Sequence, residues 1–418
     1  GGRLSIRGQT GPKGAHGGRI DLADGRVEVP ARQVALDGVA ATLAFGAPGP
    51  AEFFTLTTAT ARHLATPPVF TPLTLTGRVQ RGAHGLAFSL DGTAADPSAR
   101  VQVRGRHAPG TGRGDLEARL GPLAFAPGGL QPGALAPALA TLKAANGRAE
   151  ASARLRWQPG ALTGTADLAL NDISFEAPEA AVEGLSGTLH LESLFPPASA
   201  PGQRLTVRRI DPGVGLEDIA VSYGIAATPR PRLEVAEAAF SIAGGRVRTR
   251  DLVLDPAAPR QVIPLEIDGL DLAEAFDLLN VDGLSGDGRL SGTIPVVADA
   301  TGIEISGGRL DAAGPGRLRF DSEAAKRVLA SAGDSADLML RALRDFRYDK
   351  LSLTLDEERA GTARLGLMLL GNNPRVLDGY PFRFNINLET NPIRLMGALR
   401  EAYRISNRAL RRLWMPGP

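Results

Sequence analysis

The chain has 418 residues, of which 43% are hydrophobic and 22% charged, and its formal net charge is +2. This composition is too apolar for a disordered protein, and the charge balance excludes a nucleic-acid binder that works by bulk positive charge. The chain contains no cysteine, which excludes disulfides, thiol catalysis and thiolate metal sites.

The beginning of the sequence carries no targeting signal. It starts at Gly1, and no basic and then apolar leader follows. The longest apolar stretch, residues 365–370, is far shorter than the roughly 18 residues that a spanning helix needs. We therefore expect a piece of a longer precursor, with any N-terminal anchor lying upstream.

Most of the chain alternates between apolar and polar residues, which predicts antiparallel strands with one buried and one wet face. The clearest runs are residues 290–294, 318–320, 351–355 and 382–388. The expected fold is mainly β, an elongated and curled antiparallel sheet with a few helices near the C-terminus. Turns are expected at Asp91-Gly92, Pro159-Gly160, Gly244-Gly245, Gly307-Gly308 and Arg359-Ala360-Gly361.

Helical patterns are few. We predict helices over residues 134–145, over 272–280 with Asp271 as a possible N-cap, over about 322–346 with a break near Gly333, and over about 392–414. These predictions divide the chain into a repeated β-strand groove (1–320), a helical insertion (321–347), further strands of the same sheet (348–390) and a basic amphipathic tail helix (391–418).

Two stretches of the sequence repeat each other. Residues 21–30 resemble 167–178, and each is followed by an acidic residue and a glycine, Asp37-Gly38 in one and Glu183-Gly184 in the other. Weak repeats of strand units predict a stack that grows along one axis.

The sequence contains almost no pattern that is typical of a catalytic site. No histidine pairs with another at helical ligand spacing. The stretches around Ser186 and Ser285 begin like a nucleophile elbow but lack its final glycine and a following helix. The sequence predicts no catalytic residue, no cofactor and no metal site, and a protein that is not an enzyme.

The last residues are strongly basic. Between residues 393 and 414 there are six arginines and one acid, with apolar residues near one helical face. Such a helix can lie on an anionic membrane or a partner, or it can cap the end of the sheet, and the sequence leaves both open. The residues expected to contact a membrane or partner are Arg400, Arg404, Arg408, Arg411, Arg412, Leu413 and Trp414.

The stretch from residue 283 to 413 resembles the C-terminal part of the YdbH family, a branch of the AsmA-like proteins that is also labelled as a dicarboxylate-transport domain. The order and spacing of several blocks carry the resemblance, which is weaker upstream. The blocks are residues 286–296, 303–310, 314–320, 342–351, 371–374 and 384–392.

The resemblance implies a bridge-like lipid-transfer protein that moves phospholipids between the inner and outer membranes through a hydrophobic β-groove. This chain would be the distal part of the bridge, in the periplasm, with an inner-membrane anchor outside the sequence. The C-terminal end is expected to pair with a small outer-membrane lipoprotein. The dicarboxylate label finds no support, because no cationic cluster on an apolar face would select a small diacid.

Elementary physics agrees with a groove, since curling a sheet with one apolar face produces one. The residues expected to line it are Leu290, Ile294, Leu318, Phe320, Leu351, Leu353, Leu355, Phe382, Phe384, Ile386 and Leu388. The edge near 382–388 is expected to accept a partner strand, and the helix over 322–346 to plug or gate the groove's end. Two alternatives remain: an AsmA-like assembly factor or chaperone for outer-membrane proteins, and a structural β-repeat with a filled core.

Overall fold

The fold is known from a computed structural model of the chain. It describes residues 2–10, 16–30, 33–45, 52–82, 85–178, 180–211, 214–228, 232–255, 258–279, 283–299, 302–322, 334–357 and 363–390. By its internal contacts the chain divides into two units, residues 1–205 and residues 206–418. The predicted boundary at 320/321 falls inside the second unit, and the predicted tail helix lies outside the described residues.

The mainly β prediction is confirmed. In the described part of the chain, twenty-three strands form one antiparallel sheet that does not close, and a separate hairpin pairs β12 (Ser193–Leu194) with β13 (Pro197–Ala198). Two α-helices, α1 (Leu272–Leu279) and α3 (Asp334–Leu343), occur in the same described ranges. Strands that follow one another in sequence are hydrogen-bonded neighbours over most of the sheet, which is the local pairing expected of a meander.

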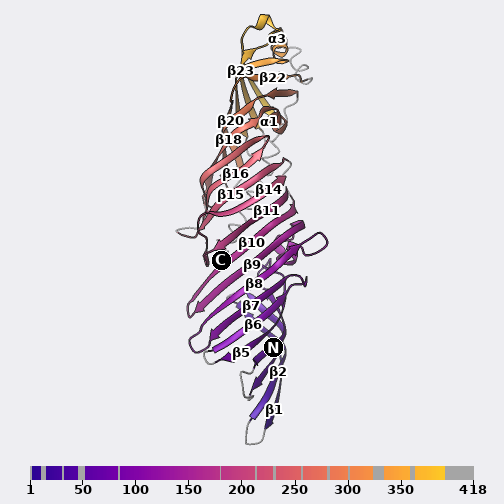
Figure 1. The fold of residues 1–418 in the computed structure, drawn as a ribbon, viewed down its shortest axis with the longest axis vertical. Coiled ribbons are helices and arrows are strands. Elements are labelled where there is room, and N and C mark those ends of the chain that lie inside the picture. Colours follow the sequence, from indigo (N-terminus) through magenta and orange to yellow (C-terminus); the bar gives the residue numbers. More distant parts are fainter. Residues whose placement is uncertain are drawn as a thin grey trace. The chain divides into compact units, whose positions relative to one another are not determined.

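Unit 1 is such a meander, in which each strand from β2 to β10 pairs with the strand before it and the strand after it. Strands β5 to β11 run side by side in Figure 1. The elements are β1 (Arg3–Thr10), β2 (His16–Val29), β3 (Val34–Phe45), β4 (Glu52–His63), β5 (Leu73–Gly82), β6 (Gly85–Thr93), β7 (Arg100–Ala108), β8 (Arg113–Phe125), η2 (Pro132–Ala134), η3 (Pro137–Leu139), β9 (Lys143–Gln158), β10 (Ala161–Ala177), β11 (Ala180–Leu191), β12 (Ser193–Leu194) and β13 (Pro197–Ala198). Strand β14 (Gln203–Asp211) spans the boundary between the units.

Unit 2 continues the antiparallel pattern and adds the two α-helices. Its strands β18, β20, β21, β23, β24 and β25 pair in that order. The elements are β15 (Leu216–Ala226), β16 (Arg232–Ile242), β17 (Gly245–Leu254), β18 (Arg260–Asp271), α1 (Leu272–Leu279), β19 (Leu284–Asp287), β20 (Arg289–Asp299), β21 (Gly302–Ala312), β22 (Gly316–Phe320), α3 (Asp334–Leu343), β23 (Phe346–Glu357), β24 (Ala363–Asn372), η4 (Leu377–Gly379) and β25 (Phe382–Thr390).

The sequence repeat has a structural counterpart. In β2 the residue before Gly25 is Asp24, with φ of 52°, and Gly25 pairs with Val39 just after Gly38, whose φ is 60°. In β10 and β11, Asp172 and Gly184 occupy the equivalent places with φ of 50° and 70°, and Ile173 pairs with Leu185. Both pairs shift register there. Such bulges bend a strand and increase its twist, so each repeat curls the sheet at the same point.

The four alternating segments are strands as predicted, within β20, β22, β23 and β25. The turn at Pro159-Gly160 joins β9 to β10, and Gly244 lies in the turn before β17. Two turn predictions are wrong. Asp91-Gly92 lies inside β6, where Gly92 leaves room for the side chains of Leu75 and Val101. Gly307-Gly308 lies inside β21 at a bulge. The turn predicted at residues 359–361 lies outside the described residues.

Of the helix predictions, one is confirmed, one is wrong and one falls only partly within the described residues. The one over 272–280 is confirmed as α1, and the Asp271 carboxylate accepts hydrogen bonds from the backbone N–H groups of Ala273 and Glu274 at 3.0 and 3.3 Å. The one over 134–145 is wrong, because Ala136, which precedes Pro137, is extended at φ −147° and ψ 131°. Two short 3-10 helices and the start of β9 occupy that segment. Of the one over 322–346, the described part holds α3, which ends at Leu343, and Phe346 begins β23.

Candidate functional site

The most unusual surface of unit 1 is an apolar sheet face that is only half-buried. On β5 to β10 the side chains alternate between one face of intermediate exposure and one exposed face. We call the first of these the half-buried face. Its apolar members are Leu73, Leu75, Val79, Leu86, Phe88, Leu90, Val101, Val103, Leu116, Ala118, Leu120, Ala151, Ala153, Leu155, Trp157, Leu162, Ala166 and Leu168.

Strand register joins these residues into rows that cross the sheet. Along one row Leu90 pairs with Val103, Val103 with Ala118, and Ala118 with Ala153, which in turn pairs with Ala166. Adjacent strands are about 4.8 Å apart, so the six strands give a face about 24 Å wide. The apolar surface is therefore continuous across the strands as well as along them.

Large side chains lie flat on this face because glycines face them on neighbouring strands. A Cβ added at Gly105 would come 2.4 Å from Cζ of Phe88, and one added at Gly114 would come 2.2 Å from Cζ2 of Trp157. Both rings therefore occupy the space over a glycine in the adjacent strand. This arrangement keeps the face low in relief while retaining aromatic surface.

We expect Gly105→Ala to destabilise unit 1 by about 1–3 kcal/mol, because the new methyl group would meet the Phe88 ring and the carbonyl oxygen of Asp115, also 2.4 Å away. Urea denaturation of the variant measures the loss. Gly110→Ala is the matched control, since a Cβ there has nothing within 4 Å. Equal stability of the two variants would show that the ring does not lie over Gly105.

The half-buried face is not the wall of a packed core. Among the described residues, a small core around Val39 contacts Leu75 and Leu90, and another around Leu123 contacts Leu120. Within the described ranges, the other members of the half-buried face neither belong to a buried cluster nor pack against one. A normal sandwich would cover such a face with a second sheet. Here most of it keeps surface that another apolar molecule can contact.

In unit 2, by contrast, the apolar face of the sheet is buried in a packed core. Its apolar face is filled by one large cluster that includes Leu272 and Phe276 of α1 and Leu343 of α3, all at most 1% exposed. The residues predicted to line a groove lie in this unit. Leu290, Leu318, Leu351, Leu353 and Leu355 are buried members of the cluster, at 0–4% exposure. Ile294, Phe320, Phe382, Phe384 and Ile386 are partly buried and pack against it.

Of the remaining predicted site residues, the structure describes only the strand register of Leu388. Leu388 pairs with Leu365 in the register of β25 with β24. The tail residues Arg400, Arg404, Arg408, Arg411, Arg412, Leu413 and Trp414 lie outside the described residues. The half-buried face of β5 to β10 was not among the predicted site residues, although its alternation is legible in the sequence Leu73-Thr74-Leu75-Thr76.

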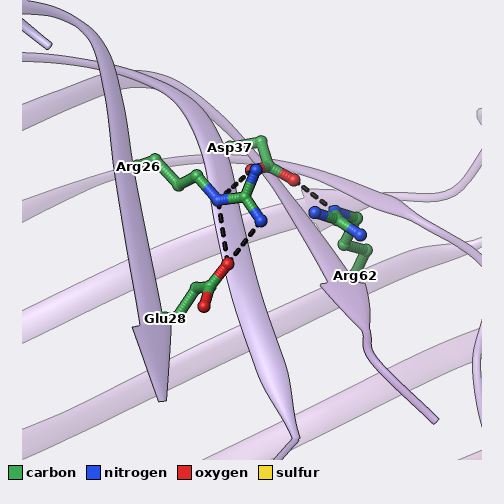
Figure 2. Close-up of polar contacts among 4 residues, drawn as sticks. All are labelled: Arg26, Glu28, Asp37 and Arg62. Carbon is green, nitrogen blue, oxygen red and sulfur yellow. Dashed lines mark hydrogen bonds and ion pairs between the residues drawn. The ribbon is translucent and has the colours of Figure 1, made fainter. Parts of the chain in front are cut away.

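Ion pairs link side chains of neighbouring strands on the polar face of unit 1. Figure 2 shows Arg26 of β2 between Glu28 and Asp37, and Arg62 of β4 on the other side of Asp37. The Arg26 Nε lies 2.9 Å from Oε1 of Glu28 and 3.5 Å from Oδ1 of Asp37. The hydrogen bond from Arg62, with the charge of Arg26 as a smaller cause, lowers the pKa of Asp37 below its usual value.

This network predicts an acid-sensitive contribution to stability. A carboxylate whose pKa is lowered by folding contributes stability that is complete above its unfolded-state pKa and is lost as the pH falls through its folded-state pKa. We expect the melting temperature of Asp37→Asn to fall less steeply than that of the parent chain in that acidic window. Arg62→Gln should have a similar effect, because it removes the main cause of the shift. Parallel melting curves against pH in all three proteins would contradict the assignment.

The described residues offer little that resembles catalysis. Ser186 lies in β11, where its Oγ accepts a hydrogen bond from the backbone N–H of Asp172 at 2.9 Å, and Ser285 lies in β19. No group of three His, Asp or Glu side chains in the described ranges could hold a metal ion. The same ranges contain no helix long and apolar enough to cross a membrane.

Comparison with known families now decides the affiliation. The family model described as "YdbH-like: Intermembrane phospholipid transport protein YdbH" matches residues 3–413. The chain belongs to the YdbH-like family. The resemblance drawn from residues 283–413 is confirmed, and it extends over nearly the whole sequence. No curated protein and no solved structure gives a significant match.

Membership of the YdbH-like family supports a role in lipid transport and suggests a role that is not enzymatic. It also gives the half-buried face a chemical meaning. A phospholipid has acyl chains that need apolar cover and a headgroup that needs water. A broad apolar surface with an ionic reverse side offers the first without requiring a closed pocket.

Proposed function

We propose that this YdbH-like chain is part of a periplasmic bridge and carries phospholipids between the inner and outer membranes along the half-buried face of unit 1. The single observation that supports this most strongly is the apolar face of β5 to β10, most of which packs against no buried core formed by described residues. Family membership supports phospholipid as the cargo.

An apolar face lowers the free energy needed to move a lipid through water. Removing a methylene from water is worth roughly 0.8 kcal/mol, so a two-chain lipid with about 30 methylenes faces a barrier of roughly 25 kcal/mol if it crosses water alone. A continuous apolar face removes most of that barrier at every step. Because neighbouring positions are chemically alike, the lipid can slide without being bound tightly at any one of them.

The contrast between the units narrows the proposed path. Leu290 and Leu318 are 0% exposed and Leu353 is 1% exposed, so they have almost no surface to share with an acyl chain in this conformation. Among the residues first expected to line a groove, the partly buried ones can contact lipid, namely Ile294, Phe320, Phe382, Phe384 and Ile386. We propose that the packed core of unit 2 serves as a scaffold and that lipid contacts its partly buried margin.

We further propose that β25 receives a strand from an outer-membrane lipoprotein. Among the described residues β25 pairs with β24 alone, and a strand edge with free backbone groups is a template for an added strand. The basic residues from Arg400 to Arg412 would then lie near an anionic surface. Truncation of the chain after residue 381 should abolish capture of the lipoprotein and leave lipid binding by unit 1 intact.

The test of the transport proposal is mass spectrometry of organic extracts from the purified chain. We expect phospholipid at a substantial fraction of one molecule per protein. The control is the same chain with Val103→Glu and Leu155→Glu, two substitutions on the half-buried face, which should carry less lipid. Extracts of the unaltered chain that contain no lipid would reject the transport role, as would a preparation of that chain that instead carries unfolded outer-membrane protein.

A further inference from the structure

The ends of strands β6 to β9 form a hollow where the two faces of the sheet meet. Its volume is about 610 Å³. Leu86, His107 and Trp157, from the last row of the half-buried face, line it together with Arg106, Arg113 and Arg156 from the alternate positions. Residues of the apolar row and arginines of the alternate, exposed positions therefore both line this hollow at the rim of the apolar surface.

The three arginines of this rim have no polar partner among the described residues. Arg106, Arg113 and Arg156 make no hydrogen bond and no ion pair with any described residue, in contrast with Arg26 or Arg119 on the same sheet. Among the described residues that line the hollow, Asp115 is the one acid. Asp115 lies directly opposite Arg106 on one neighbouring strand and Arg156 on the other in the strand register. The hollow keeps a net positive charge, which favours an anion.

The aromatic pair of the rim is also arranged for an interface. The Nε1–H of Trp157 donates to Nδ1 of His107 at 3.3 Å, and the two rings stack with centroids 6.1 Å apart. The polar atom of Trp157 is thus satisfied within the protein while its ring stays on the apolar row. Tryptophan prefers such positions, where one side is apolar and the other is wet.

We propose that this rim binds the phosphate of a phospholipid headgroup while the acyl chains lie on the half-buried face. Guanidinium groups match phosphate oxygens with paired, charge-assisted hydrogen bonds. The inference rests on the proposed function, because it takes the cargo to be a phospholipid. It adds that the lipid is oriented, with its headgroup held at the ends of β6 to β9 and its chains directed along the sheet.

The test uses the fluorescence of Trp157 in the full chain. Trp157 is one of two tryptophans, so Trp414→Phe leaves it as the single reporter. The probes are dihexanoylphosphatidylglycerol, the uncharged dihexanoylglycerol and glycerol 3-phosphate, which separate the headgroup from the chains. Arg106→Gln, Arg113→Gln and Arg156→Gln are compared with Arg148→Gln, an exposed arginine near the opposite end of β9.

We expect each rim substitution to weaken the binding of dihexanoylphosphatidylglycerol about tenfold, which is the usual effect of losing one charge-assisted hydrogen bond. Binding of dihexanoylglycerol should not change, and Arg148→Gln should behave as the parent chain. Unchanged phosphatidylglycerol binding in all three rim variants overturns the rim site but leaves lipid transport standing. Glycerol 3-phosphate that binds as tightly as the phospholipid also overturns it, since the chains would then contribute nothing. Failure of both lipids to bind the parent chain rejects the proposed function itself.

Discussion

Leu116→Glu is expected to remove lipid from the purified chain while leaving it folded. Leu116 lies near the start of β8 on the half-buried face, opposite Leu155 and Gly105. A carboxylate there is already half-exposed in the free protein, so its cost to folding is small. Contact with acyl chains would strip its water and cost several kcal/mol. We expect the lipid content measured by mass spectrometry to fall by at least about tenfold.

The matched control for this variant is Ser89→Glu. Ser89 is exposed on the opposite face, and it pairs across the strands with Arg78 and Arg104. The same charge is therefore added without entering the proposed lipid path. Equal loss of lipid from both variants would mean that net charge, and not the apolar face, controls binding.

Leu353→Ala is expected to have the largest effect on stability. Leu353 is 1% exposed within the packed cluster of unit 2, and such a truncation costs about 2–5 kcal/mol through lost burial and the cavity it leaves. Leu116→Ala should cost about 1 kcal/mol, because the parent side chain is already partly in water. Hydrogen exchange of the peptides that cover β23 and β8 measures the two losses separately.

A similar loss at both positions would contradict the difference between the units. It would indicate that the half-buried face is packed as tightly as the core of unit 2. Loss of protection across the whole chain in Leu353→Ala would show instead that the two units unfold together.

The class of fold could be predicted because strand alternation is a local property. Residues 382–388 alternate without a break, and they form β25 paired with β24 in the expected manner. The N-cap at Asp271 was legible for the same reason. The helix expected over 134–145 failed because the restriction that Pro137 places on Ala136 outweighs the helical propensity of the alanines around it.

The state of the apolar face could not be predicted from alternation. Leu353 and Leu116 both sit in strands with apolar residues at every second position, but one is buried and the other is half-buried. The difference depends on what covers each face: α1 and α3 contribute to the cluster in unit 2, whereas Leu116 has no buried cluster beside it among the described residues. Burial of that kind is set by contacts distant in sequence, which a period-two pattern does not contain.

Glycines in this sheet occur inside strands as well as in turns. Glycine is common in turns, and the sequence alone therefore predicts turns at Gly92 and Gly307. One makes room for cross-strand side chains inside β6, and the other adopts φ of 74° at a bulge in β21. In this sheet glycine serves packing and curvature inside strands as well as turns between them.

A lipid path along the half-buried face is tested by photo-crosslinking in cells, with a photoreactive amino acid placed singly at Leu116, Ser89 or Leu353. These positions sample the half-buried face of unit 1, its polar reverse side and the packed core of unit 2. We expect phospholipid adducts at position 116 and none at positions 89 and 353. Adducts at 353 with none at 116, or adducts at 89 as frequent as those at 116, would contradict a lipid path along the half-buried face.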